Sequence, residues 1–139
     1  MKVVIDTNCL LVTIPYDSKY YCLWEAFLNK KFVLCYSNEI MKEYEELLYR
    51  FYSPDTTFLT MELLSESKNV IKTIPYYKWN LIPADPDDNK FVDCAVNARA
   101  DYIVTNDKHF NVLKKVNFPF VQVIDIDTFM QIVFGMPEL

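Results

Sequence analysis

Apolar and polar residues follow one another along this chain in blocks that predict short buried strands and amphipathic helices. Helical blocks repeat apolar residues every three or four positions, whereas strand blocks are short continuous apolar runs. The predicted strands cover residues 3–5, 32–36, 102–105 and 121–124. The predicted helices cover 18–29, 37–51, a segment restarting at 53–54, a segment opening at 85, and a last helix through 134. Strands alternating with helices predict an α/β domain with a parallel sheet.

The predicted helix boundaries rest on capping residues and prolines. Ser37 is a typical N-cap, Pro54 suits a first helical position, and Asp125 or Asp127 caps the terminal helix. Pro75 and Pro83 interrupt the stretch 70–83, which we expect to be irregular.

Acidic residues follow three of the predicted strands, and Asp125, after the last of them, is a candidate helix cap. Asp6 ends the run Val3-Val4-Ile5, and Asp107 comes just after the strand at 102–105, in a segment expected to be a loop. In open α/β sheets ligands bind beyond the carboxyl ends of the strands. Asp85 is a good N-cap for the helix that follows, and on a helical wheel Asp88 falls on its apolar side. Asp88 and Asp107 are therefore expected to meet in one crevice.

Other interpretations of these acids remain open. An acid at a strand end is often only a loop residue, and Asp88 has the spacing of a capping-box partner for Asp85. Glu43 lies at the border of the apolar stripe of the helix 37–51, among several acids expected to be solvated. Asp93 falls well away from the apolar side of its helix, which predicts exposure to solvent.

Composition limits the available chemistry. The chain has 139 residues, fits one domain spanning 1–139, and is 52% hydrophobic, which is enough for a core. With one glycine, Gly135, and one histidine, His109, neither a Walker loop, a dinucleotide fingerprint nor a His-rich metal site is possible. The formal charge of −5 argues against a passive nucleic-acid binder. A negative net charge is compatible with an enzyme that binds phosphate groups through bound cations.

The cysteines and the distribution of apolar residues indicate the cellular compartment. The four cysteines, Cys9, Cys22, Cys35 and Cys94, are isolated among apolar residues and are expected to be buried, reduced thiols. An acid at position 6 is incompatible with a signal peptide, and no apolar run approaches the roughly 20 residues that span a bilayer. We therefore expect a cytoplasmic protein without a membrane partner.

Four motifs together resemble the PIN-domain nucleases. They are Val-Val-Ile-Asp6-Thr-Asn, Ile-Met-Lys-Glu43-Tyr, Asp85-Pro-Asp-Asp88-Asn-Lys-Phe, and Ala-Asp-Tyr-Ile-Val-Thr105-Asn-Asp107-Lys-His-Phe. They cover nearly the whole chain in the family's order. The chain is most similar to the prokaryotic branch that includes VapC-like toxins. The resemblance implies a three-layer α/β/α sandwich with a central, mostly parallel sheet and a carboxylate cluster that binds Mg²⁺ or Mn²⁺. It also implies an endoribonuclease that hydrolyses RNA phosphodiester bonds, often a homodimer that binds an antitoxin.

The resemblance also assigns roles to single residues. Asp6, Glu43, Asp88 and Asp107 match the four acidic catalytic and metal-binding positions, and Asn8 and Thr105 match polar supporting positions. Asp93 is a candidate ligand of a second ion through water. Asp85 and Asp87 are interpreted as capping residues only. Lys90, Lys108 and His109 flank the expected site as candidate RNA contacts, with solvated surface charges as the alternative.

Surface aromatics bear on partners. We expect a homodimer and an antitoxin helix to contact part of a set of aromatic residues: Tyr49, Phe51, Tyr52, Phe58, Tyr76, Tyr77 and Trp79. The cluster at 76–79 has a composition that also suits base stacking, but packing in the core or at an interface is favoured.

Three other functions compete with the nuclease. A phosphoacceptor receiver domain needs an acidic pair after the first strand, where Thr7-Asn8 stands. A haloacid-dehalogenase-like phosphatase needs Asp-x-Asp there, and Asn8 occupies the second position. A catalytically inactive PIN fold that only binds a partner is the remaining alternative.

Overall fold

The fold centres on a parallel sheet. The computed structural model describes residues 1–135, so residues 136–139 of the predicted domain lie outside the described part. Within that part the sheet has five strands in the order β3-β2-β1-β4-β5, and every neighbouring pair is parallel. The strands are β1 (Lys2–Ile5), β2 (Val33–Tyr36), β3 (Val70–Lys72), β4 (Tyr102–Val104) and β5 (Val123–Ile124). The predicted parallel sheet is confirmed.

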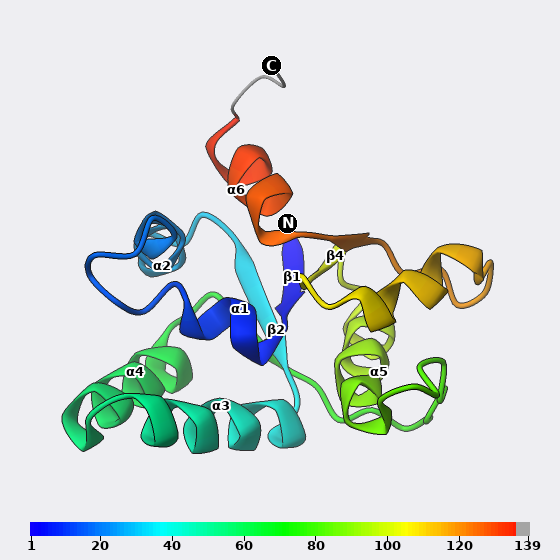
Figure 1. The fold of residues 1–139 in the computed structure, drawn as a ribbon, viewed down its shortest axis with the longest axis horizontal. Helices are drawn as coiled ribbons and strands as arrows, with labels where there is room; N and C mark the ends of the chain where they lie inside the picture. The colour runs from blue at the N-terminus through cyan, green and yellow to red at the C-terminus, as the bar shows by residue number, and fades with distance from the viewer. Residues whose placement is uncertain (136–139) are drawn as a thin grey trace.

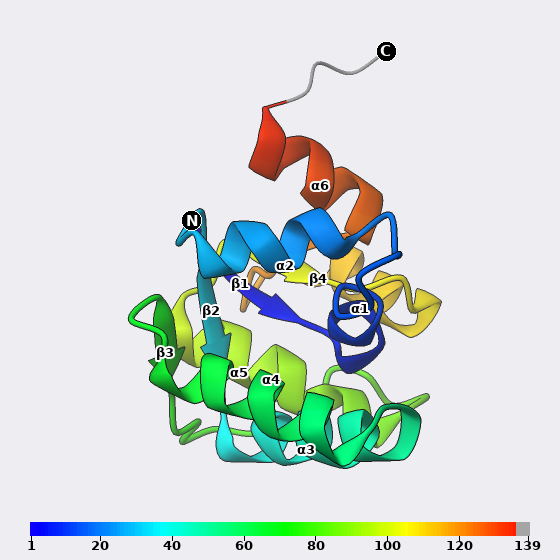
Figure 2. The same cartoon turned by 90° about the vertical axis from the view of Figure 1, so that its left-hand side faces the viewer.

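Helices cover both faces of this sheet (Figures 1 and 2). The helices α2 and α6 lie on one side, and α3, α4 and α5 lie on the other. This arrangement confirms the predicted three-layer α/β/α fold. The α-helices are α1 (Thr7–Leu11), α2 (Tyr21–Leu28), α3 (Asn38–Phe51), α4 (Pro54–Glu66), α5 (Asn89–Ala98) and α6 (Ile126–Phe134), and η1 (Pro86–Asp88) and η2 (Lys108–Lys115) are 3₁₀ helices.

The predicted capping residues explain where three of the helices begin. The hydroxyl of Ser37 accepts a hydrogen bond from the backbone of Ile40, and Ser53 does the same for α4. At α6 the cap is Asp125, not Asp127, because the Asp125 carboxylate accepts from the Thr128 backbone at 2.7 Å. Each cap satisfies a backbone N–H that the first helical turn leaves without a partner.

Four local predictions were wrong. The five residues of α1 had not been predicted as a helix, because so short a segment shows no period. The next helix begins at Tyr21 and not at 18, because residues 15–20 form turns. The irregular stretch contains β3, whose Val70 pairs with Leu34 of β2. The expected loop after Asp107 is η2. Pairing across the sheet and short 3₁₀ turns leave no periodic signal in the sequence.

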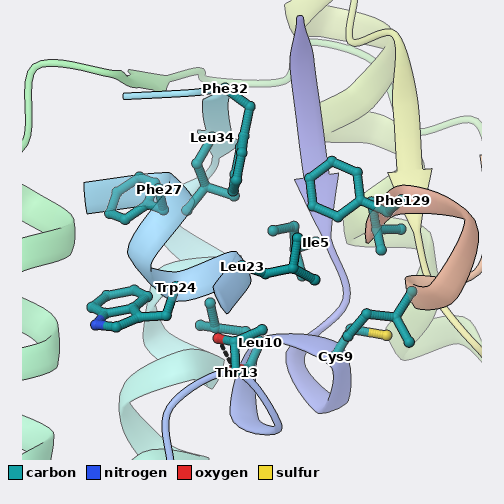
Figure 3. Close-up of a pocket in the computed structure, with 12 residues that line it drawn as sticks. Ile5, Cys9, Leu10, Thr13, Leu23, Trp24, Phe27, Phe32, Leu34 and Phe129 are labelled. Carbon is teal, nitrogen blue, oxygen red and sulfur yellow. Dashed lines mark hydrogen bonds between the residues drawn. The ribbon is translucent and has the colours of Figure 1, made fainter. Parts of the chain in front are cut away.

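Aromatic side chains fill the space between the sheet and the pair α2 and α6 (Figure 3). Trp24 stacks on Phe27 with ring centroids 5.3 Å apart, and Phe32 meets Phe129 edge-on at 5.0 Å. The space left among these side chains is about 10 Å³, about the volume of a single water-sized probe. This face of the sheet is therefore packed core and offers no room for a ligand.

The cysteines lie within the described part and none forms a disulfide. Cys9, Cys35 and Cys94 are buried as predicted, whereas Cys22 is only half-buried beside Met130. Burial raises the pKa of Cys9 to about 12 and that of Cys35 to about 11, which keeps both thiols protonated. Among residues 1–135, no helix combines the length and the apolar character needed to cross a membrane.

Candidate functional site

The strand order creates a crevice at the carboxyl ends of β1 and β4. From β1 the chain continues to β2 on one side, whereas β4 is added on the other, so the direction of winding reverses between β1 and β4. Such a switch point is where ligands bind in open α/β sheets. A receiver domain has the order 2-1-3-4-5. The observed order 3-2-1-4-5 excludes that alternative.

Asp6 and Thr105 face each other across this switch point. Ile5 and Val104 are partners in the sheet register, so the next residue of each strand lies at the same edge. The Asp6 backbone N–H donates to the Val104 carbonyl at 2.9 Å, and the Thr105 hydroxyl donates to the Asp6 carboxylate at 2.7 Å. Only 6% of Asp6 is exposed. Thr105 therefore holds the Asp6 carboxylate in place, and its supporting role at a catalytic site stays a prediction.

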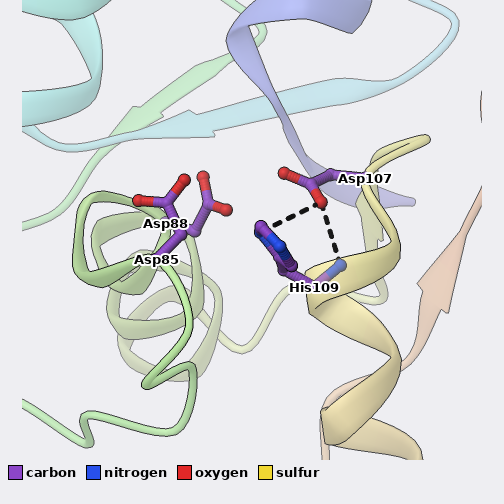
Figure 4. Close-up of side chains that lie close together, drawn as sticks. All are labelled: Asp85, Asp88, Asp107 and His109. Carbon is purple, nitrogen blue, oxygen red and sulfur yellow. Dashed lines mark hydrogen bonds and ion pairs between the residues drawn. The ribbon is translucent and has the colours of Figure 1, made fainter.

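A second group of side chains faces this pair. Asp88 ends η1 and opens α5, and Asp107 follows β4. One potential ligand atom of each of Asp85, Asp88, Asp107 and His109 lies within 4.8 Å of the others. Figure 4 shows Asp85 and Asp88 facing Asp107 and His109, which come from the opposite side of the crevice. The expected meeting of Asp88 and Asp107 is thus present in the fold.

Asp85 is the capping residue of this turn, and Asp88 is not. The Asp85 carboxylate accepts from the Asp87 backbone at 3.2 Å, whereas the Asp88 side chain makes no capping hydrogen bond. The capping-box alternative for Asp88 is therefore wrong. Asp85 was interpreted as a cap only, yet its carboxylate also belongs to the acidic group. Its spacing of one helical turn from Asp88 was the signal in the sequence that could have shown this.

Asp88 is buried without compensation. One of its carboxylate oxygens, Oδ2, is fully buried and has no hydrogen-bond partner among the described residues. Burial, together with the nearby charges of Asp85, Asp107 and Asp6, raises the pKa of Asp88 to about 7. A buried carboxylate is costly unless a proton, a cation or hydrogen bonds compensate its charge. The geometry therefore leaves a place for a positive charge beside Asp88.

Asp6 is affected in the same way. Burial raises the pKa of Asp6, and the Thr105 hydrogen bond partly offsets that rise. The carboxylates of Glu43 and Asp107 raise the pKa of Asp6 as well, which shows that these charges act on one another. The site thus concentrates negative charge within a poorly solvated crevice.

Glu43 borders the group from α3, and its charge is paired. The Lys90 ammonium lies 2.5 Å from a Glu43 oxygen, and the Thr7 hydroxyl donates to the other oxygen at 2.5 Å. Only 11% of the Lys90 side chain is exposed, and its ammonium also donates to the Asp87 carbonyl at 2.7 Å. Lys90 is therefore an internal ion-pair partner, and the fold gives it another role than the expected RNA contact. No periodic pattern in the sequence predicts the contact of Thr7 with Glu43.

The prediction that Asp93 points to solvent was wrong. Asp93 is only 8% exposed, because the segment before Pro83 crosses its side of α5. Its carboxylate accepts a hydrogen bond from the Trp79 backbone at 3.0 Å. Burial raises the pKa of Asp93, and the Trp79 hydrogen bond lowers it. Asp93 thus anchors a chain segment, and it does not belong to the tight group around Asp88.

The other predicted site residues lie around the acids. Asn8 is exposed and lines a hollow of about 390 Å³ together with Asp6, Tyr20 and Asp107. Lys108 is exposed at the start of η2. His109 is exposed too, and both its backbone N–H (2.9 Å) and its Nδ1 (3.4 Å) approach the Asp107 carboxylate. His109 is therefore closer to the acids than a peripheral RNA contact would be.

The donor set fits a hard divalent cation. Carboxylate oxygens are the ligands that Mg²⁺ and Mn²⁺ prefer, and Mg²⁺ commonly binds through one or two carboxylates while keeping several waters. The orphaned oxygen of Asp88 and the nearby carboxylates of Asp107 and Asp85 provide such ligands. Thr105 and Thr7 fix the orientation of Asp6 and Glu43, as outer hydrogen bonds do in metal sites.

Comparisons with known proteins agree with this geometry. The family model described as PIN domain matches residues 2–109, which include all four predicted acids. No curated protein sequence is similar enough to this chain to count as a match. The resemblance predicted from the four motifs is therefore confirmed at the level of the family.

Solved structures share the fold at low sequence identity. VapBC2 from Rickettsia felis, bound to a DNA fragment from its promoter, gives a TM-score of 0.61 at 14% identity over 90% of this chain and 98% of that chain. The PIN domain endonuclease Utp24 gives 0.54 at 18% identity over 90% and 84%. FitAB bound to an IR36 DNA fragment gives 0.55 at 10% identity over 88% and 94%.

Proposed function

This chain belongs to the PIN-domain family, and on that basis we propose that it is a divalent-metal-dependent endoribonuclease. The observation that carries the proposal is the buried Asp88 oxygen without a hydrogen-bond partner in the described part of the chain, in a crevice shared with Asp107 and Asp6. A carboxylate in that state is poised to bind a cation. The PIN domain of Utp24 is described as an endonuclease, which supports nuclease chemistry on this fold.

The proposal divides the work among the residues of the site. Asp6, Asp88 and Asp107 would bind Mg²⁺ or Mn²⁺, with Asp85 at the rim. Glu43, held by Thr7, would complete the acidic set from α3. The bound ion would supply an activated water and would stabilise the charge on the leaving oxygen of an RNA phosphodiester. Thr105 keeps Asp6 oriented, Asn8 lines the hollow beside it, and Lys108 and His109 are placed to contact phosphate.

Cleavage of a labelled single-stranded RNA tests this function. We expect cleavage with Mg²⁺ or Mn²⁺, no cleavage in EDTA, and loss of activity in Asp6→Asn and Asp107→Asn. The matched control is Asp55→Asn, which removes an exposed carboxylate in the first turn of α4. Cleavage that persists in EDTA, or that survives Asp107→Asn, would show that the acids are not the catalytic centre.

We further propose that this nuclease is a cytoplasmic toxin with a cognate antitoxin and that it forms a homodimer. Support comes from the similarity to VapC-like toxins and from the fold shared with VapBC2. Tyr49, Phe51 and Phe58 on α3 and α4 are 62–71% exposed, as expected of an interface, whereas Tyr52 is tied to the Leu11 carbonyl. Light scattering at tens of micromolar measures the dimer; a strictly monomeric protein would refute it.

An inactive PIN fold that only binds a partner remains the second candidate. The ion pair between Lys90 and Glu43 favours it, because it neutralises one of the four acids from within the chain. Metal titration separates the two candidates. An inactive fold should gain no thermal stability from Mg²⁺, whereas a nuclease should gain it through ligands that include Asp88.

A further inference from the structure

Three aromatic side chains form a row on the surface beside α5. We call Tyr77, Trp79 and Phe118 the aromatic row. The ring centroids of Tyr77 and Trp79 are 4.6 Å apart, and Phe118 meets Trp79 edge-on at 5.8 Å. Tyr77 is 63% exposed and Phe118 is 82% exposed, while Trp79 is half-buried between them. The row joins two segments that lie on the same side of α5 in Figure 1.

The two segments that supply this row carry only positive charge. Residues 67–84 and 108–124 contain none of the nineteen acids of the chain. They contain six of its fourteen lysines and arginines, in a chain whose net charge is −5. These residues are Lys68, Lys72, Lys78, Lys108, Lys114 and Lys115. Aromatic rings and lysines within the same segments are the combination with which proteins bind single-stranded nucleic acid.

A second group of exposed aromatics has more acids than bases beside it. Tyr49 and Phe58 line a groove of about 620 Å³ between α3 and α4 together with Glu45, Glu46 and Arg50. Carboxylates beside aromatic rings repel a phosphate backbone, so that groove suits a protein partner better. The exposed aromatics of α3 and α4 thus lie beside acids, whereas those of the aromatic row lie in lysine-bearing segments.

The aromatic row is hydrogen-bonded to α5, the helix that begins at the proposed site. The Trp79 backbone donates to Asp93, which lies five residues after Asp88, or about 7.5 Å along a helix. Lys78 and Lys90 line a hollow of about 190 Å³ at the start of α5, together with the acids Glu39, Asp87 and Asp93. The aromatic row therefore lies beside α5, the helix whose start carries Asp88.

We propose that unpaired RNA bases stack on Tyr77, Trp79 and Phe118 while the phosphate of the same strand occupies the acidic crevice. The inference rests on the proposed function, and it deepens it by naming an unpaired strand as the substrate. It also replaces the expectation that Tyr77 and Trp79 pack in the core or at a protein interface. Stacking is tolerant of sequence because every base has an aromatic face.

Tryptophan fluorescence provides a direct test. The chain has two tryptophans, and Trp24 is buried in the core, so quenching by added RNA reports on Trp79. The probe is an unstructured RNA of about 12 nucleotides, within the usual site sizes for single strands. It is titrated in EDTA, which prevents cleavage, and binding is also measured by anisotropy. We expect quenching by this RNA and much weaker quenching by a duplex of the same length.

Substitutions in the row should weaken binding in proportion to the lost stacking. We expect Phe118→Ala to weaken RNA binding about tenfold, within the range seen for base stacking. Because Phe118 is largely exposed, this variant should fold. Trp79→Phe should keep most of the affinity while losing the fluorescence signal. Tyr16→Ala, which removes an 86% exposed aromatic from the turns before α2, is the matched control and should bind RNA as the wild type does.

The outcomes separate this inference from the proposed function. If RNA leaves Trp79 fluorescence unchanged and Phe118→Ala binds normally, while cleavage still depends on Asp107, the row is not an RNA site and the nuclease stands. If Phe118→Ala instead converts a dimer to a monomer without affecting RNA binding, the row is a protein interface and the inference is overturned. If RNA is neither bound nor cleaved, the proposed function fails as well.

Discussion

The buried charge of Asp88 should destabilise the metal-free protein at high pH, and Asp88→Asn should relieve this. The substitution keeps the shape of the side chain and removes a charge that burial and three neighbouring carboxylates oppose. An asparagine amide can also donate a hydrogen bond toward Asp107, as a protonated Asp88 would. The metal-free variant should therefore be more stable than the wild type above pH 7.

The magnitude follows from the pKa of Asp88. A rise from 3.8 to about 7 corresponds to about 4 kcal/mol at about 1.4 kcal/mol per pKa unit. Because the folded state holds the proton more tightly, wild-type stability should fall as the pH rises from about 4 to about 7. Relaxation around Asp88 lowers the expected gain to about 2–4 kcal/mol, or roughly 10 °C in Tm for a domain of this size.

Thermal melts of both proteins in EDTA, at about pH 4 and about pH 8, measure this effect. The two Tm values should nearly coincide at the lower pH and separate at the higher one. Asp87→Asn is the matched control, since Asp87 is exposed one residue earlier and should change stability little at either pH. Mg²⁺ at one hundred times its Kd should stabilise the folded wild type by about 2.7 kcal/mol and so raise its Tm, and it should leave the Tm of Asp88→Asn unchanged. A difference between the variants that does not grow with pH would refute the reasoning.

Three further predictions concern residues around the site. Lys90→Met leaves the Glu43 carboxylate without its cation and should lower the free energy of unfolding by about 1–3 kcal/mol. Chemical denaturation in EDTA measures this, and an unchanged midpoint would show that water compensates the charge of Glu43. Asp93→Asn can still accept from the Trp79 backbone, so it should be as stable as the wild type and should bind Mg²⁺ equally well by calorimetry, unless Asp93 is a metal ligand. Asp125→Ala removes the cap of α6 and should cost about 0.5–2 kcal/mol at neutral pH. The Thr128 hydrogen bonds lower the pKa of Asp125, so this cost should disappear as acid protonates the carboxylate, and a cost that persists in acid would indicate a packing defect.

The contrast between Asp88 and Asp93 shows how far the sequence could predict the site. A helical wheel places Asp88 on the apolar side of α5 because that side packs on the sheet, and Asp88 is buried as expected. The same wheel places Asp93 in solvent, because a helical wheel contains no information about other parts of the chain that pack against the helix, here the segment that contains Trp79. Asp93 and Trp79 are 14 residues apart, and the intervening prolines leave no periodic signal.

The ion pair between Lys90 and Glu43 could not be predicted from the sequence either. Each residue lies near the border of a helical stripe, where periodicity does not distinguish solvent from a neighbouring helix. Their ion pair depends on how α3 packs against α5, which is a tertiary feature. By contrast, Asp6 and Asp107 could be placed at the same sheet edge, because parallel strands expose their carboxyl ends on one side.

The hydrogen bond between Thr105 and Asp6 joins residues 99 positions apart in the chain. During synthesis on the ribosome, Asp6 emerges long before Thr105, the residue that orients its carboxylate. β4 cannot pair with β1 until residue 104 has been made, and Asp107 comes later still. Contacts between residues so distant in sequence form late in folding. A nascent chain therefore cannot assemble its acidic crevice before most of the domain has been translated. The ribosome that synthesises the protein is thus not exposed to an active nuclease until the domain is nearly complete.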